Sequence, residues 1–148
     1  MQKKTYKLYH GENLMPWAKG TAVKGAKGFI FLSGTEGHDP NQHFQKGGGI
    51  AEGAEAQWKL ALQKIKDRLE EMGSSLENIC HIFIFVAGPF PNGVVNSPNY
   101  RLDVLDDFFR KYHPPFCSDN NPPSSTLLGV SLADPRMCVE LQVIAAIP

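Results

Sequence analysis

The chain has 148 residues, a length that suits one domain with a buried core of its own. Its 15 basic and 15 acidic residues cancel, and neither sign forms a long block. Because nucleic-acid binding needs a concentrated basic surface, this balance predicts no nucleic-acid partner. The first residues lack an apolar signal region, and no stretch reaches the ~18 apolar residues of a membrane span, so we expect no membrane partner.

The first part of the chain predicts three short strands, at residues 4–9, 21–24 and 29–32. The connection at residues 25–28 is bounded by glycines and suits a hairpin between the second and third strands. Residues 35–49 are polar and rich in glycine, which predicts a loop.

Residues 53–73 predict one amphipathic helix. Its apolar positions recur every three or four residues and form one buried stripe: Ala54, Trp58, Ala61, Ile65, Leu69 and Met72. Gly73 supplies the left-handed residue that ends the helix. Two oppositely charged pairs stand at helical contact spacing, namely Glu55 with Lys59 and Lys66 with Glu70.

The second half predicts a strand at residues 80–86, a second helix and two final strands at residues 125–130 and 138–147. Ser97 suits the N-cap of the second helix and Pro98 its first position, and the helix ends before Pro114. The predicted order is therefore β-β-β-α-β-α-β-β in a single domain.

The strands at residues 80–86 and 138–147 are apolar on both faces. One face of each suits packing against the helices, and the other carries Phe83, Phe85 and Ile144. Since no predicted element is left to cover that second face, we expect self-association.

The cysteines are Cys80, Cys117 and Cys138, an odd number without Cys-x-x-Cys spacing. They predict neither a disulfide framework nor a zinc ribbon, and a reducing cytoplasm is the expected compartment. His38, Asp39 and His43 are too loosely spaced in one loop to predict a metal site. We expect no metal and no cofactor.

Four motifs in order resemble the Rid family, the YjgF-type reactive-intermediate deaminases. They are the strand ending in Ser-Gly at residues 29–34, the helix with its Gly-Ser-Ser-Leu-Glu-Asn turn and following strand, residues 122–126, and residues 139–145. The resemblance runs from about residue 17 to residue 146. It implies one α+β domain over residues 1–148, with a six-stranded mixed sheet and two helices on one face, as in chorismate mutase. It also implies a homotrimer with sites between subunits.

Glu140 is the principal candidate for catalysis. It lies in the last strand, on the face predicted for the subunit interface. An ionised carboxylate there needs partners, or it becomes suited to proton transfer. A carboxylate satisfied by backbone N–H groups or by an arginine across the interface is the structural alternative. The family resemblance implies that Glu140 orients or activates the attacking water.

Three further residues are candidates for binding the substrate. Ser33 and Gly34 end a strand where a ligand oxygen could approach main-chain N–H groups closely. An ordinary turn explains these two residues equally well. The resemblance implies that this turn lines the site and that Trp17 walls it, although core packing also accounts for Trp17.

The chain departs from the family pattern after Pro123. Family deaminases place there an arginine that grips the substrate carboxylate, whereas this chain has Ser124 and Ser125. Both serines are candidate substrate-binding residues. Arg101 could supply the missing charge, or the substrate could be larger, such as a ring-fission enamine like 2-aminomuconate.

The predicted function is therefore hydrolysis of a small enamine or imine to a carbonyl compound and ammonia. The alternative is a non-catalytic homotrimer that binds a small metabolite or protects other proteins. A ribonuclease activity is disfavoured by the neutral charge.

Overall fold

The computed structural model describes residues 1–39, 41–42, 48–87 and 121–148. The predicted second helix and Arg101 lie outside these residues. The described elements are β1 (Gln2–His10), β2 (Asn13–Lys24), β3 (Gly28–Phe31), β4 (Thr35–Glu36), α1 (Ala54–Glu71), the 3-10 helix η2 (Leu76–Asn78), β5 (Ile79–Val86), β6 (Ser124–Gly129) and β7 (Val139–Ile147).

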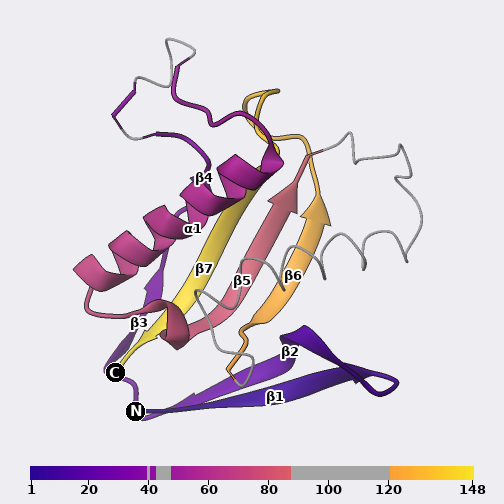
Figure 1. The fold of residues 1–148 in the computed structure, drawn as a ribbon. Coiled ribbons are helices and arrows are strands. Elements are labelled where there is room, and N and C mark those ends of the chain that lie inside the picture. The colour runs from indigo at the N-terminus through magenta and orange to yellow at the C-terminus, as the bar shows by residue number, and fades with distance from the viewer. Residues whose placement is uncertain (40, 43–47, 88–120) are drawn as a thin grey trace.

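All the described strands join one mixed sheet (Figure 1). The strand order is β1-β2-β6-β5-β7-β3, and β4 also pairs with β7. The contacts of β6 with β2 and β5 are parallel, and the other pairs are antiparallel. The predicted mixed sheet is confirmed, with a seventh strand, β4, inside the stretch predicted to be a loop.

The predicted hairpin at residues 25–28 is wrong. β2 pairs with β1, whereas β3 pairs with β7 at the other end of the strand order. The hairpin forms one connection earlier, where the positive φ of Gly11 (61°) allows a tight turn between His10 and Asn13. The first two thirds of β2, residues 13–20, were not predicted as a strand. They contain Pro16, and proline is unfavourable in a strand.

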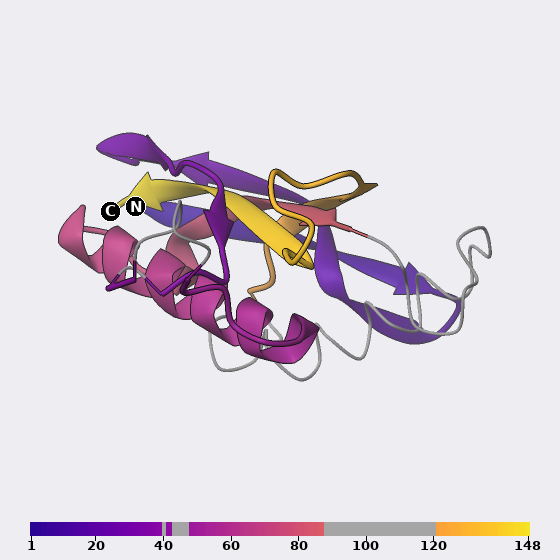
Figure 2. The same ribbon diagram turned by 90° about the horizontal axis from the view of Figure 1, so that it is seen from above.

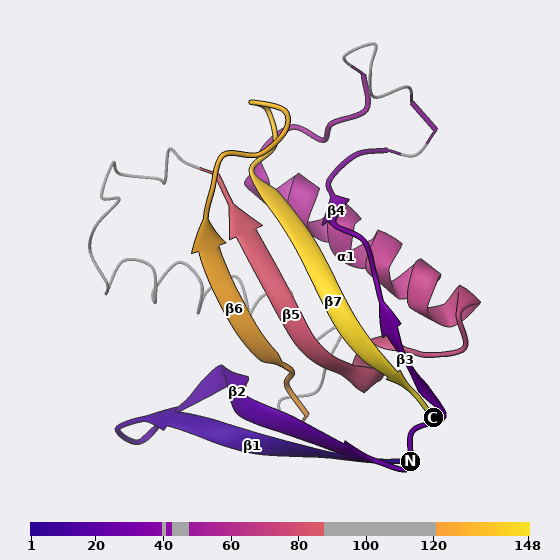
Figure 3. The ribbon, with the colours of Figure 1, turned by 180° about the vertical axis from the view of Figure 1, so that it is seen from behind.

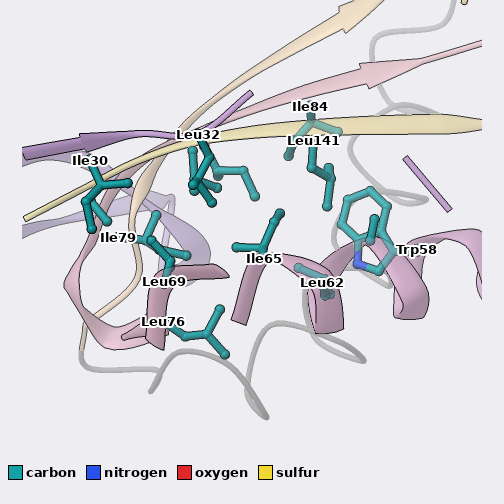
Figure 4. Packing of buried hydrophobic residues seen from close by; sticks show 14 of the residues in the cluster. Ile30, Leu32, Trp58, Leu62, Ile65, Leu69, Leu76, Ile79, Ile84 and Leu141 are labelled. Atoms are coloured by element: carbon teal, nitrogen blue, oxygen red, sulfur yellow. The ribbon is translucent and has the colours of Figure 1, made fainter. Parts of the chain in front are cut away.

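α1 covers one face of the sheet (Figure 2), and the core fills the space between them (Figure 4). Four of the six predicted stripe residues are buried, whereas Ala54 and Met72 at the helix ends are exposed. The positive φ of Gly73 (78°) ends the helix as predicted. Both predicted charge pairs form: Lys59 to Glu55 at 3.1 Å and Lys66 to Glu70 at 2.8 Å. In the described part of the chain, no helix combines the length and apolar character needed to cross a membrane.

The opposite face of the sheet carries no described helix or strand over β5 and β7 (Figure 3). Aromatic side chains lie along it, with the rings of Phe83 and Phe85 stacked at 6.4 Å between centroids. Phe31 is 72% exposed, Phe29 51% and Leu128 45%. We call this surface the open face. Its apolar character is as predicted, and self-association stays a prediction.

Candidate functional site

Glu140 lies on β7 between Val139 and Leu141, which are both buried in the core. Strand alternation therefore turns Glu140 to the open face. Its side chain occupies the space beside the Cα atom of Gly34, where a Cβ atom would lie 2.8 Å from the carboxyl carbon. Glycine at position 34 is thus what lets the glutamate lie against the strand. The structure brings these two predicted site residues together.

The segment that carries Gly34 is anchored to α1 by a hydrogen bond from Arg68. Arg68 Nη1 donates to the hydroxyl of Thr35 at 2.7 Å, and this hydroxyl donates to the carbonyl of Ser33 at 3.1 Å. Thr35 is fully buried, whereas Ser33 is exposed. Arg68 of α1 and the hydroxyl of Thr35 therefore fix the backbone on both sides of Gly34.

Lys64, one turn before Arg68 on α1, binds the next residues of this segment, Glu36 and His38. Lys64 Nζ donates to the carbonyls of Glu36 and His38, both at 3.0 Å, and to Glu36 Oε1 at 3.1 Å. Glu36 is the register partner of Glu140 in the pairing of β4 with β7. Two glutamates are thus register partners at this edge of the sheet, and the carboxylate of Glu36 is paired with Lys64.

Ser124 belongs to a separate polar cluster on the open face. Its hydroxyl lies 2.8 Å from His81 Nδ1 and donates to the carbonyl of Cys80 at 3.0 Å, while His81 Nε2 lies 3.2 Å from Thr126 Oγ1. The Ser124 hydroxyl has a single proton, which it donates to the carbonyl of Cys80. It must therefore accept a hydrogen bond from His81 Nδ1–H, and His81 Nε2 then accepts from Thr126. Burial lowers the pKa of His81, in keeping with this neutral ring.

The distance between this cluster and Glu140 is large. Along β5, Ser124 stands beside His81 and Glu140 beside Phe85, four residues further on. The separation is about 13 Å along the strand and roughly 10 Å across the sheet, because β6 and β7 flank β5. One small molecule cannot contact both side chains of the same subunit.

The structure describes two of the remaining candidates, Ser125 and Trp17. Ser125 pairs with Ile82, so it faces the α1 side of the sheet rather than the open face. Trp17 is partly buried and packs against the core. Their roles in binding stay predictions, as does that of Arg101 outside the described residues. In the described part of the chain, no three His, Cys, Asp or Glu side chains are grouped to hold a metal ion.

The residues that the sequence analysis missed are Glu36, Lys64, Arg68 and His81. Lys64 and Arg68 are spaced four apart on α1, which places them on one side of the helix. That spacing was the available signal, although it does not say which strand the two cations reach.

The mixed sheet with one long helix on one face and an open aromatic face defines an α+β domain of the Rid type. The family model described as endoribonuclease L-PSP matches residues 12–147, and the chain belongs to this family. The resemblance to the Rid family is thereby confirmed. None of the curated proteins matches the sequence.

Solved structures share the fold at low identity. The Rid family protein YyfB from Yersinia pestis is 15% identical over 99% of each chain, with a TM-score of 0.68. YyfA from the same organism is 16% identical over 99% of this chain and 100% of that one, with a TM-score of 0.60. A YjgF family protein from Neisseria meningitidis is 19% identical over 100% of this chain and 97% of that one, with a TM-score of 0.57.

Proposed function

We propose that this protein hydrolyses a small enamine, through its imine tautomer, to a carbonyl compound and ammonia. The observation that carries the proposal is the Glu140 carboxylate, which lies against a strand-ending glycine on an open face. Within the described residues it has no ion-pair partner. A carboxylate without a cation is free to take a proton from water.

In the proposed reaction, Glu140 takes a proton from a water molecule as the water oxygen attacks the carbon of the nitrogen-protonated imine, and the electron pair of the C=N double bond moves to nitrogen. The resulting carbinolamine carries a hydroxyl and an amino group on one carbon. Glu140 then gives its proton to the amino nitrogen, the C–N bond breaks as ammonia leaves, and the hydroxyl group becomes the carbonyl by releasing its proton to water. The exposed Ser33 and the backbone beside Gly34 would hydrogen-bond the substrate next to the glutamate.

The proposed site depends on the association of several copies of the chain. Since Ser124 lies too far from Glu140 of the same subunit, a role for Ser124 in the same site requires a second copy of the chain. The family resemblance implies a homotrimer, and the exposed aromatic side chains of the open face favour such self-association. We therefore propose sites shared between subunits.

The test is ammonia release from 2-aminoacrylate or 2-aminomuconate, generated in place by an upstream enzyme. Glu140→Gln is expected to lower kcat by about 10²–10⁴-fold, the usual contribution of a general base, because it removes the base and keeps the shape. Full activity in Glu140→Gln would show that the glutamate is structural.

One observation favours the alternative of a binding module without turnover. The hydroxyl of Ser124, at the position where the family resemblance implies a carboxylate-gripping group, is already engaged by His81 and the carbonyl of Cys80. If neither substrate is hydrolysed faster than in buffer, the binding function takes precedence.

The family description names an endoribonuclease, an activity that this chain supports less. The chain is neutral overall. The β1–β2 hairpin, residues 2–24, holds five lysines and one acidic residue, and these lysines lie away from Glu140 on β7. Single-stranded RNA incubated with the same preparation is expected to stay intact.

A further inference from the structure

The pairing of β3 and β4 with β7 contains one extra residue, because residues 32–34 stand opposite only residues 142–143 of β7. Such an extra residue is a β-bulge, and it shifts the alternation of the side chains that follow it. Leu32 and Thr35 are three positions apart, which in a regular strand would place them on opposite faces. Both are nevertheless buried, at 4% and 0% exposure, so the bulge turns Thr35 to the α1 side of the sheet.

The peptide group between Ser33 and Gly34 lies at this bulge, and Thr35 fixes its orientation. The Thr35 hydroxyl, on the α1 side, donates to the carbonyl of Ser33 at 3.1 Å. In a trans peptide the N–H points away from the C=O, so the N–H of Gly34 points to the open face. Glu140 lies against Gly34 on that face. Within the described residues, the Gly34 N–H donates to no other group.

Arg68 determines the direction in which the Thr35 hydroxyl donates. Arg68 Nη1 donates to this hydroxyl at 2.7 Å, a charge-assisted bond that occupies the acceptor side of the oxygen. The single hydroxyl proton is then directed to the carbonyl of Ser33. Arg68 thus applies its charge to a buried hydroxyl. Other cations of α1 pair with glutamates, namely Lys59, Lys64 and Lys66.

We propose that Arg68 is a positioning residue for the Glu140 site: through the Thr35 hydroxyl it holds the Ser33–Gly34 peptide with its N–H directed to the open face, as a donor for a substrate oxygen. A hydrogen bond accepted by the carbonyl also polarises the peptide and strengthens this N–H as a donor. The ligand is a small molecule with a carboxylate or carbonyl oxygen next to the reacting carbon. Its use of the donor rests on the proposed function, whereas the orientation of the peptide rests on the contacts alone.

The first experiment observes this peptide group directly by NMR. Ser33–Gly34 is the only Ser-Gly step in the sequence, so cell-free synthesis with ¹³C-carbonyl serine and ¹⁵N-glycine gives one coupled pair of signals. In Arg68→Met the Ser33 carbonyl signal is expected to move upfield and the Gly34 ¹⁵N signal to move with it, because the carbonyl loses its hydrogen bond. Thr35→Val, which keeps the shape without the hydroxyl, is expected to shift both signals in the same directions. Arg68→Lys, which keeps a charged donor, is expected to restore most of the signal.

Lys66→Met is the matched control, because Lys66 is a cation of the same helix that pairs with Glu70 at 2.8 Å and does not reach Thr35. It is expected to leave both signals unchanged. If Arg68→Met does not fold, Arg68→Gln, which is polar but too short to reach the Thr35 hydroxyl, carries the same test. Unchanged signals in the folded Arg68 variant would overturn the proposal, as would an equal shift in Lys66→Met.

The second experiment separates substrate binding from the chemical step. Arg68→Met is expected to raise KM about tenfold, the contribution of one hydrogen bond to a charged group, while kcat is largely kept. Glu140→Gln lowers kcat instead. An unchanged KM in Arg68→Met would contradict the use of this donor by the substrate. Shifted signals without turnover in any variant would support the orientation of the peptide and contradict the proposed function.

Discussion

His81 illustrates how a single side chain is constrained by the open face. Its ring lies 4.4 Å from that of Phe83, and both ring nitrogens are engaged by the hydroxyls of Ser124 and Thr126. The neutral ring satisfies every partner in this cluster. Burial lowers the pKa of His81 because the charged form loses hydration.

This lowered pKa predicts a loss of stability in mild acid. The unfolded chain takes up a proton near its ordinary pKa of about 6.5, before the folded protein does. Stability contributed by the neutral ring is therefore present above that pH and lost as the pH falls towards the lowered folded value. His81→Gln is expected to show a smaller fall in the free energy of unfolding between pH 7.5 and pH 5.5, measured by urea denaturation at one fixed protein concentration. Equal falls in both proteins would contradict the prediction.

At the scale of elements, Gln57 joins the start of α1 to the start of β7. It is 1% exposed, and its amide donates to the carbonyls of Ala51 and Arg136 at 2.9 and 2.8 Å. Its carbonyl oxygen accepts from the backbone N–H of Cys138 at 2.7 Å. One side chain thus satisfies three backbone groups from two distant segments.

Replacing Gln57 by leucine keeps the volume and leaves these three backbone groups without their partner. Since each buried unsatisfied group costs about 1–3 kcal/mol, Gln57→Leu is expected to lower the free energy of unfolding by roughly 3 kcal/mol or more. Gln63→Leu is the control on the same helix, because Gln63 is exposed and bonds only Asp67 among the described residues. Its cost is expected to stay within about 0.5 kcal/mol. Similar losses in both variants would show that the Gln57 network contributes little.

At the scale of the whole molecule, the open face exposes apolar side chains that no described element of the same chain covers. Phe29 and Phe31 on β3 and Leu128 on β6 extend its apolar character across the sheet. Such a surface marks an interface more often than a free face.

Phe31→Asp is therefore expected to weaken assembly. Sedimentation velocity of the unchanged protein should give a species near three times the 16.4 kDa chain mass, and the variant should shift towards the monomer. Met72→Asp replaces another exposed apolar residue, which is 48% exposed at the end of α1, and is expected to leave assembly unchanged. A stable monomer of the unchanged protein at micromolar concentration would contradict the predicted trimer.

Several parts of the fold follow from local sequence alone. The helix stripe from Trp58 to Leu69, its end at Gly73 and the strand that follows depend on periodicity and on one glycine, and both are local properties. The placement of Glu140 on the open face follows from strand alternation, which the sequence displays directly. The predicted hairpin at residues 25–28 failed because the sequence specifies turns without specifying which strands pair.

Only the tertiary structure decides which distant residues meet. The contact of Glu140 with Gly34 and the hold of Lys64 on Glu36 arise because β4 pairs with β7 and α1 packs beside them. The separation of Ser124 from Glu140 likewise depends on β5 lying between β6 and β7. The sequence determined the residue types and the faces they occupy, because side-chain periodicity is local. The pairing of strands decided the site, because it joins segments that are far apart in the chain.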